Sequence, residues 1–276
     1  MKYLISIVIF LLTFNNLFAQ NQENLTSHRK GDFYLYWGWN WSWYNKSDIR
    51  FEGENYDFTL EKVRAKDRQS TFDWGTYFNP STATIPQYNV RIGYFISDKY
   101  NISIGTDHMK YVAQQGQTVK ITGSIAGTDT EYDGVYANED ITIQEGFLQY
   151  EHTDGLNYPN IELRRLDELV RFNKISINLI EGFGVGVLLP RTNATLLNNQ
   201  RYDEFHLSGY GMGAVLGVNV SVGKAFFFQS EWKGGFINMS DIRTTNSELD
   251  KASQKIFFSQ LNIIFGATLK SKKHNK

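Results

Sequence analysis

Residues 33–45 read FYLYWGWNWSWYN, a run in which large apolar side chains alternate with small, polar or tyrosine side chains. One side of the alternation carries four of the six tryptophans in the chain, Trp37, Trp39, Trp41 and Trp43. Alternate positions of an extended strand point to opposite faces, whereas a helix would spread these tryptophans around its circumference. The run therefore predicts a β-strand with one aromatic face.

The same period of two recurs along the chain. We expect eight strands, over residues 32–44, 87–96, 100–111, 158–170, 174–189, 205–222, 226–243 and 255–269. Their connections alternate in length: three are short (97–99, 171–173 and 223–225), and four are long and polar (45–86, 112–157, 190–204 and 244–254). Residues 58–65 and 146–152 are predicted to extend strands into the long connections. Glu181 falls on the apolar side of its strand, which predicts a bulge that resets the register.

The two ends of the chain differ in character from this alternating part. The start, MKYLISIVIFLLTFNNLFA, has a lysine, a short apolar run and a small residue at its end, as in a cleaved signal peptide over residues 1–19. A polar segment, 20–31, follows it, and a basic tail, 270–276, ends the chain. Cysteine is absent and the formal net charge is -1, which gives no electrostatic basis for nucleic-acid binding. We expect an exported protein held together without disulfides.

Strand length and the composition of the second face indicate which way the apolar face points. The expected strands are longer than the five or six residues that are roughly usual in soluble proteins, and reach the roughly nine to eleven that span a bilayer. Their second face is mainly Gly, Ser and Asn, with the isolated charges Arg91, Glu231 and Lys233. Such a face suits the crowded lumen of a narrow barrel, where charges must pair. Residues 32–269 are thus predicted to form an all-β, eight-stranded antiparallel up-and-down transmembrane barrel, closed by pairing of its first and last strands.

The signal ending FAQ, the eight alternating strands and the hairpin GYGMGAVLGVNVSVGKAFFFQSEWKGGF resemble small outer-membrane β-barrels of Gram-negative bacteria, in the style of the Bacteroidetes. The closest architecture is the transmembrane domain of the outer-membrane protein A family. The resemblance is architectural and covers nearly the whole mature chain. It implies an outer-membrane location, with short turns and the 270–276 tail on the periplasmic side and long loops outside. The chain departs from the pattern at its end, since KSKKHNK follows the last strand where a terminal aromatic residue is common.

This reading assigns two sets of site residues. The lumen should be plugged by a polar network that includes Arg91, Glu231 and Lys233, because an eight-stranded barrel is just filled by side chains. Aromatic residues should mark the membrane interfaces: Trp37, Trp39, Trp41, Trp43, Trp232, Phe226 and Phe228. We expect a non-catalytic role, structural or through surface interaction at loops 45–86 and 112–157, without cofactor or metal. The expected partners are outer-membrane lipid and an extracellular ligand or protein.

Three alternatives stay open. His206 and Ser208 share a face in a strand and are similar to the His-x-Ser pair of outer-membrane lipid A deacylases, which also need a carboxylate to orient the histidine. A secreted soluble barrel with an apolar ligand inside would turn the tryptophans inwards. A stacking site at Trp41 and Trp43 would serve an extracellular ligand. The His-Asp pairs in GTDHM (105–109) and EHTDG (151–155) fit hydrogen bonding at the rim better than a metal site.

Overall fold

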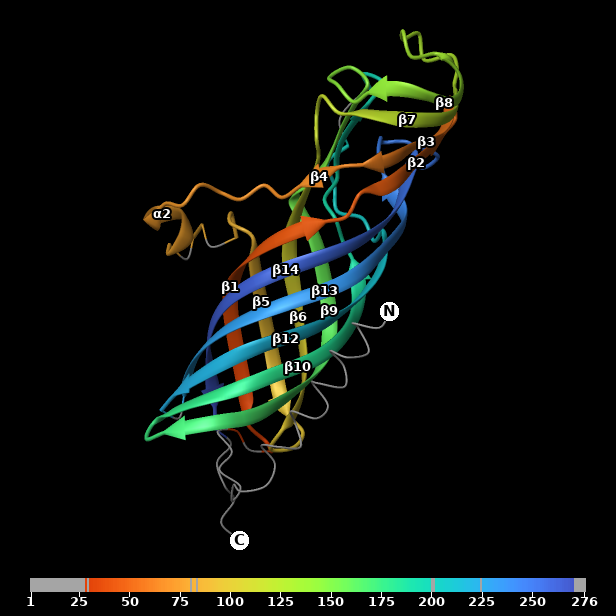
Figure 1. Ribbon diagram of the computed structural model, residues 1–276. Coiled ribbons are helices and arrows are strands. Elements are labelled where there is room, and N and C mark those ends of the chain that lie inside the picture. The colour runs from red at the N-terminus through yellow and green to blue at the C-terminus, as the bar shows by residue number, and fades with distance from the viewer. Residues whose placement is uncertain are drawn as a thin grey trace.

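The structure is a computed structural model that describes residues 28, 30–79, 81–82, 84–199, 202–223 and 225–270. Within these residues eight antiparallel strands form a closed barrel (Figure 1): β1 (Phe33–Tyr44), β5 (Tyr88–Phe95), β6 (Tyr100–Ala113), β9 (Leu148–Phe172), β10 (Ile175–Leu188), β12 (Gly209–Val222), β13 (Phe226–Arg243) and β14 (Lys251–Leu269). Each strand pairs with the next in this order, and β14 pairs with β1 over twelve residues from Phe33 to Tyr44. The predicted fold and strand order are confirmed. The signal peptide expected at 1–19 and residues 271–276 of the tail lie outside the described residues.

A lobe stands on the end of the barrel that carries the long connections (Figure 1). It contains β2 (Ser47–Gly53), β3 (Tyr56–Val63), β7 (Thr118–Ile125) and β8 (Gly134–Thr142), which continue the sheet from β14 in this order. β11 (Asn193–Leu196) pairs with the upper part of β9, and β4 (Ala65–Lys66) pairs with β6. A short helix, α2 (Trp74–Tyr77), projects sideways from the rim. The long connections therefore contain strands of their own, and we call the part built from β2, β3, β7, β8 and β11 the lobe.

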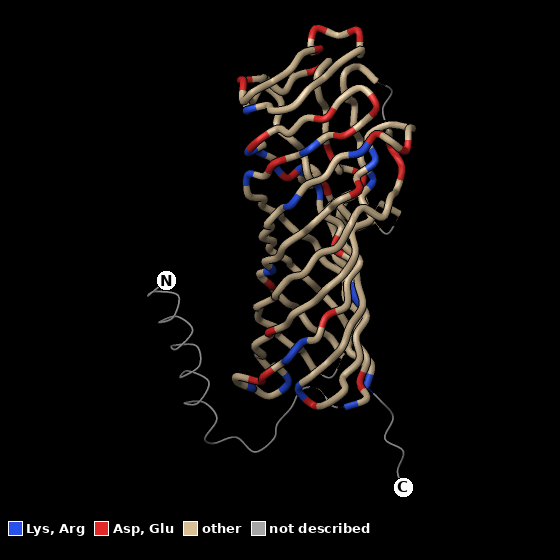
Figure 2. The backbone as a smooth tube through the Cα atoms, turned by 90° about the vertical axis from the view of Figure 1, so that its right-hand side faces the viewer, with Lys and Arg blue, Asp and Glu red and all other residues tan. Residues whose placement is uncertain are grey.

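Side chains alternate between a filled interior and an exposed wall. In β1, Tyr34 and Tyr36 are 6% and 2% exposed, whereas Phe33 and Leu35 are 47% and 53% exposed. Trp43 lies on the same outer face and is half exposed. The soluble alternative, which requires inward tryptophans, is therefore wrong. Figure 2 shows that charged residues gather in the lobe and at the short-turn end, with few on the barrel between them.

The predicted bulge at Glu181 is wrong. β10 alternates without a break, so that Glu181 lies on the outer face between Leu179 and Phe183. The irregularity in this pair of strands falls instead between Ile177 and Asn178, where β9 carries the additional residue. Arg165 of β9 lies opposite Glu181 in the register, so a residue of opposite charge is next to it on the outer face.

Inward glycines make room for inward aromatic rings on neighbouring strands. A Cβ atom at Gly93 would lie 2.2 Å from the ring of Tyr34, and one at Gly266 would lie 2.3 Å from the ring of Phe227. The glycine-rich second face noted in the sequence thus lets aromatic rings lie flat inside a narrow barrel.

Among the described residues, no helix is long and apolar enough to cross a membrane.

Candidate functional site

The centre of the lumen holds a carboxylate surrounded by cations. Glu162 of β9 contacts Arg91 of β5 at 3.0 Å, Arg164 of β9 at 2.6 Å and Lys233 of β13 at 2.6 Å. All four side chains are at most 3% exposed. Three strands from different parts of the sequence therefore meet at one buried carboxyl group.

Two further carboxylates complete the network. Lys233 also pairs with Asp107 of β6, and Arg164 also pairs with Glu231 of β13. This network thus contains three cations and three carboxylates, so that its charge is balanced. Hydrogen bonds from Arg91 to Tyr36 Oη (3.0 Å) and from Asn160 to Asp107 (3.0 Å) occupy remaining polar positions. Charges in a low-dielectric interior are tolerated when they are paired and hydrogen-bonded in this way.

The structure places all three sequence-predicted lumen residues, Arg91, Glu231 and Lys233, inside this network. Glu162 and Arg164 link Arg91 to Glu231. Sequence reasoning missed both residues because the alternation along strand 158–170 does not show which face points inward. Strand 158–170 contains two inward charges, Glu162 and Arg164, two positions apart, and that spacing was the available signal. Asp107 belongs to the lumen and not to the rim.

Apolar packing closes the lumen on the lobe side. The buried cluster there joins the upper barrel to the lobe and comprises chiefly Met109, Tyr111, Leu156, Tyr158, Ile237, Met239, Ile256, Phe258, Ile49, Phe51, Phe58, Leu60, Phe147 and Tyr150. These side chains are all at most 5% exposed. They fill the space above the ion network in the described part of the barrel.

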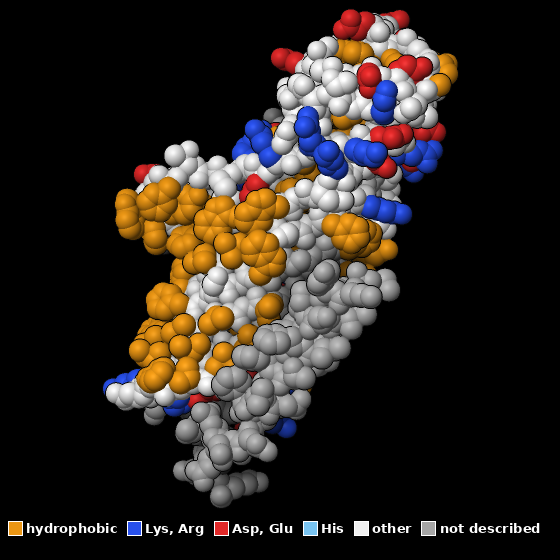
Figure 3. All heavy atoms as spheres, viewed as in Figure 1, with side chains coloured by type: hydrophobic (Ala, Val, Ile, Leu, Met, Phe, Trp, Pro, Cys, Tyr) orange, Lys and Arg blue, Asp and Glu red, His pale blue; other side chains and the backbone are white. Residues whose placement is uncertain are grey.

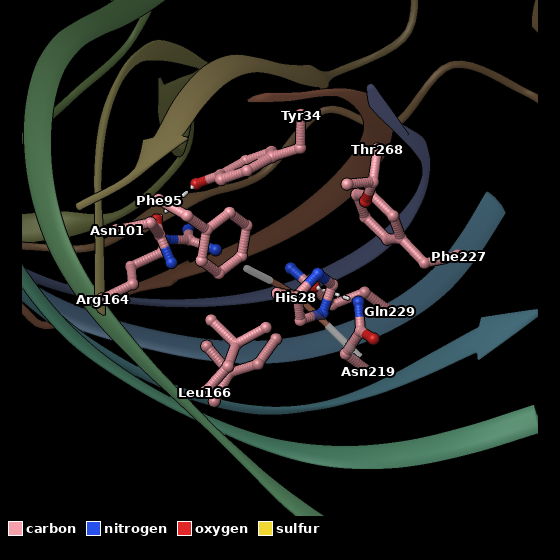
Figure 4. A pocket seen from close by; sticks show the side chains of 11 residues that line it. His28, Tyr34, Phe95, Asn101, Arg164, Leu166, Asn219, Phe227, Gln229 and Thr268 are labelled. Atoms are coloured by element: carbon pink, nitrogen blue, oxygen red, sulfur yellow. Dashed lines mark hydrogen bonds between the residues drawn. The ribbon is translucent and has the colours of Figure 1, made fainter. Parts of the chain in front are cut away.

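His28 closes the opposite end of the lumen, at the short turns. Its ring stacks on Phe95 at 4.6 Å between ring centroids and lines a cavity of ≈ 20 Å³ together with Asn101, Arg164 and Gln229 (Figure 4). Burial, together with the nearby Lys270 charge, lowers the pKa of His28 to about 4. The cavity has space for roughly one water molecule, so it is packing space and not a substrate pocket.

The outer wall is apolar, and the predicted interface aromatics all lie on it. Trp43 and Trp232 stack face to face across β14 with ring centroids 5.6 Å apart. Trp37 and Trp39 contact each other and Phe265. Trp41 is half-buried on the same face. An apolar, aromatic wall around a closed barrel with polar ends is the surface that a lipid bilayer requires.

Phe226 and Phe228 lie on this wall too, but at the other end of the barrel. They are 66% and 63% exposed and begin β13 directly after the short turn at 223–225. The two phenylalanines therefore mark the boundary of the wall on the short-turn side, whereas the tryptophans extend towards the lobe.

His206 and Ser208 do not form the pair that the deacylase alternative requires. β12 begins at Gly209, so that the alternation changes before it: Ser208 is fully buried, whereas Phe205 and Leu207 are exposed. The imidazole Nε2 of His206 lies 2.9 Å from an Asp241 carboxylate oxygen, and the Ser208 hydroxyl donates to the His206 carbonyl at 3.4 Å. In the described residues no hydrogen bond joins the imidazole to the hydroxyl, so a base and a nucleophile are not brought together.

His108 and His152 take part in hydrogen bonds at the upper end of the barrel. The His108 ring lies 2.8 Å from the side-chain oxygen of Asn157 and stacks on Tyr88. The His152 ring is buried and lies 3.1 Å from the Thr192 hydroxyl. Among the described residues there is no group of three or more side chains suited to hold a metal ion.

Comparisons with known proteins agree with the general architecture. No protein-family model matches the chain, and no curated protein does. Solved structures with a similar arrangement include the outer membrane protein OprG from Pseudomonas aeruginosa, with 11% identity over 88% of this chain and 98% of that one and a TM-score of 0.39. The outer membrane protein AlkL has 10% identity over 93% and 99% of the two chains and a TM-score of 0.41. Neisserial surface protein A has 9% identity over 86% and 99%, with a TM-score of 0.34. At this distance the comparisons carry no argument about activity, and the barrel and its lipid-facing wall rest on the geometry above.

Proposed function

We propose that this protein is a non-conducting, non-catalytic barrel of the outer membrane that presents a structured lobe to the outside of the cell. The observation that carries the proposal is the combination of a sealed lumen with a folded lobe. A pore needs a continuous polar passage, and this barrel has a charge-balanced network beneath an apolar plug. An enzyme needs converging chemical groups, and His206 and Ser208 do not converge.

The lobe has the features of a presented surface. Its strands bury a shared apolar core, including Ile49, Phe58 and Phe147, so its exposed face is held rigidly. Rigid display lowers the entropy cost of binding, because fewer side chains and loops must be ordered in the complex. Its outer hairpin, β7–β8, has no buried residue in β8 and is the part farthest from the barrel (Figure 1). We therefore assign the surface-interaction role to the lobe, with an extracellular ligand or protein as partner.

Orientation in the membrane is the first test. Because the chain has no cysteine, single cysteines can be introduced at Val135 in the lobe, which is 85% exposed, and at exposed Lys174 in a short turn. A membrane-impermeant maleimide should label Val135→Cys on intact cells, and Lys174→Cys only after the outer membrane is permeabilised. The reverse pattern would show that the lobe faces the periplasm.

Conductance is the second test. The purified protein, reconstituted in planar bilayers, should give no steady channel, whereas a porin of known conductance, inserted in parallel, reports that the assay works. A steady single-channel conductance would overturn the sealed-lumen proposal. Labelling and conductance are independent, so display and sealing are judged separately.

A further inference from the structure

A strap between β4 and β5, which the structure describes at residues 67–79, 81–82 and 84–87, runs along the outside of the barrel. β1 continues to Tyr44, but its pairing with β5 stops at Trp39, so the upper part of β1 lacks a partner strand on that side. Side chains from both ends of the strap occupy this edge. Asp67 accepts from the backbone N–H of Ser42 at 2.9 Å, and Gln87 donates to the same carboxylate at 2.9 Å. The strap is thus fastened at both ends to the barrel wall.

The middle of the strap has its own hydrogen bonds. The side chain of Asp73 caps α2 by accepting from the backbone N–H of Thr76 at 2.8 Å. The hydroxyl of Tyr77 donates to the carbonyl of Ser70 at 2.7 Å, and the hydroxyl of Thr82 donates to the carbonyl of Gly75 at 2.9 Å. These bonds hold α2 and its neighbours in a compact shape although they project from the wall.

Aromatic side chains of the strap continue the tryptophan face of β1. Trp39 contacts Phe78 at 5.3 Å and Tyr77 at 5.8 Å between ring centroids. Phe78 stacks on Trp74 at 4.9 Å, and Phe72 contacts Trp74 at 5.5 Å. An unbroken series of rings therefore leads from the barrel wall to the tip of the strap, and we call the strap residues of this series, with Ile85, the aromatic shelf.

Most of the aromatic shelf exposes a large apolar surface, which is unfavourable in water. Phe72, Trp74, Phe78 and Ile85 are 61%, 70%, 53% and 52% exposed. Isolated exposed apolar residues are ordinary, but a contiguous apolar patch marks an interaction surface. Figure 3 shows that the hydrophobic side chains on this strap join those of the upper barrel wall on the same side of the molecule.

Charge changes abruptly just above the shelf. Lys46, Lys62, Arg64 and Lys66 are exposed on the segments that lead from the barrel into the lobe. Figure 3 shows Lys and Arg side chains gathered above the hydrophobic area and absent from it. Aromatic side chains at the headgroup level, with basic side chains beyond them, match the two layers of a membrane surface that contains anionic lipid.

We propose that the aromatic shelf inserts into the outer leaflet beside the barrel, with its rings at the level of the upper acyl chains and with the basic residues above it facing anionic headgroups. Continuity with the lipid-facing wall determines this occupant, because the shelf and the wall share ring contacts through Trp39. The proposal rests on the membrane placement of the barrel and extends it to a segment outside the barrel. Lipid contact accounts for the exposure of Phe72, Trp74, Phe78 and Ile85 on the strap.

Depth-dependent quenching tests the proposal. A single cysteine at Trp74 or at Ile85 carries an NBD fluorophore in the full-length protein, reconstituted in vesicles of phosphatidylcholine and phosphatidylglycerol. Lipids with a doxyl group near the headgroup should quench both positions more than lipids labelled deep in the chain. Ile85→Cys is included because Trp74→Cys removes a large ring from the shelf and could disturb it.

Two control positions make the outcome decisive. Leu216→Cys on the barrel wall, half exposed on the outer face, should be quenched by lipid, and Val135→Cys in the lobe should be quenched only by aqueous iodide. Lipid quenching at Leu216 with only iodide quenching at Trp74 and Ile85 would overturn the shelf while leaving the barrel in the membrane. Absence of lipid quenching at Leu216 as well would overturn the membrane placement itself.

Discussion

Neutralising Glu162 tests whether the lumen is held by charge balance. Its carboxylate contacts three buried cations, at 3.0 Å (Arg91), 2.6 Å (Arg164) and 2.6 Å (Lys233). Glu162→Gln keeps the size of the side chain but leaves three cations facing two carboxylates. Removal of one partner from a buried ion pair costs about 3–5 kcal/mol, because an uncompensated charge stays in a low-dielectric interior. We expect a loss of this size in the free energy of unfolding.

The loss is measured by urea unfolding in detergent micelles, followed by tryptophan fluorescence, since the tryptophans of β1 leave the apolar wall when the barrel opens. The matched control is Glu52→Gln in the lobe. Glu52 lies 3.2 Å from Arg50, and the two side chains are 32% and 48% exposed. Exposed pairs of this kind contribute about 0–1 kcal/mol. Both substitutions replace Glu by Gln, so the difference between their losses in the free energy of unfolding reports the effect of burial.

A second substitution distinguishes charge balance from loss of contacts. Glu162→Gln with Arg91→Met removes one cation and one anion, and leaves Arg164 with Glu231 and Lys233 with Asp107 as two intact pairs. We expect this double variant to be more stable than Glu162→Gln alone, although it has lost more hydrogen bonds. A loss below about 1 kcal/mol for Glu162→Gln, or a double variant that is less stable than the single one, would refute the reasoning.

Three other predictions follow from the wall, the lower end of the lumen and the rim. Leu216→Arg places a charge on the outer wall and should lower the free energy of unfolding by about 2–4 kcal/mol, whereas Phe226→Arg, next to a short turn, should cost about 0–1 kcal/mol; equal losses in urea unfolding would contradict the membrane boundaries. The pKa of His28 is about 4 in the folded chain, and its ordinary value, which applies to the unfolded chain, is 6.5. The unfolded chain therefore takes up the proton at His28 first as the pH falls. The contribution of His28 to the free energy of unfolding is fully present above pH 6.5 and declines towards pH 4, with about 3 kcal/mol lost over that interval. His28→Phe should flatten this pH dependence, and an unchanged slope would assign it to other groups. His206→Ala should leave the acyl pattern of host lipid A, measured by mass spectrometry on expression, the same as that of the unmodified protein; a difference between the two would restore the hydrolase alternative.

The barrel could be predicted because its information is local. Strict alternation along β1, β12 and β14 identifies each strand separately, and short turns of three residues determine which strands are neighbours. Closure then follows, since an open sheet with an apolar face and two long edges would not be stable in a membrane. The strand order of the barrel required no knowledge of any individual side-chain contact.

The remaining features depend on contacts between distant segments. Pairing of β3 with β7 joins two different long connections, and no pattern within either predicts it. The orientation of Ser208 depends on where β12 begins. Continuing the alternation back from Tyr210 predicts that Ser208 faces outward, but it is buried because β12 begins only at Gly209. The aromatic shelf has no periodicity, because its rings are arranged by side-chain hydrogen bonds of the strap. The only available signal was the accumulation of aromatic residues in STFDWGTYF, directly after a tryptophan-rich strand and its hairpin.

Polarity along a single strand indicates where the membrane ends. In the lower part of β13 the inward residues are Glu231 and Lys233 and the outward residue between them is Trp232. Above Gly234 and Gly235 the same alternation continues, but the polarity of the two faces is exchanged. The inward residues Ile237 and Met239 lie in the buried apolar core, whereas Asn238 faces outward opposite Lys255.

A strand surrounded by lipid must be apolar outside, and its lumen is free to be polar; a strand surrounded by water needs an apolar interior. The reversal therefore places the upper surface of the bilayer close to the level of Phe236 and Phe257, which pair on the outer face just below Asn238. The same boundary explains why the ion network stops where the apolar plug begins. Below it, lipid stabilises the wall and polar lumen residues satisfy one another, and above it the hydrophobic effect holds the lobe together from within.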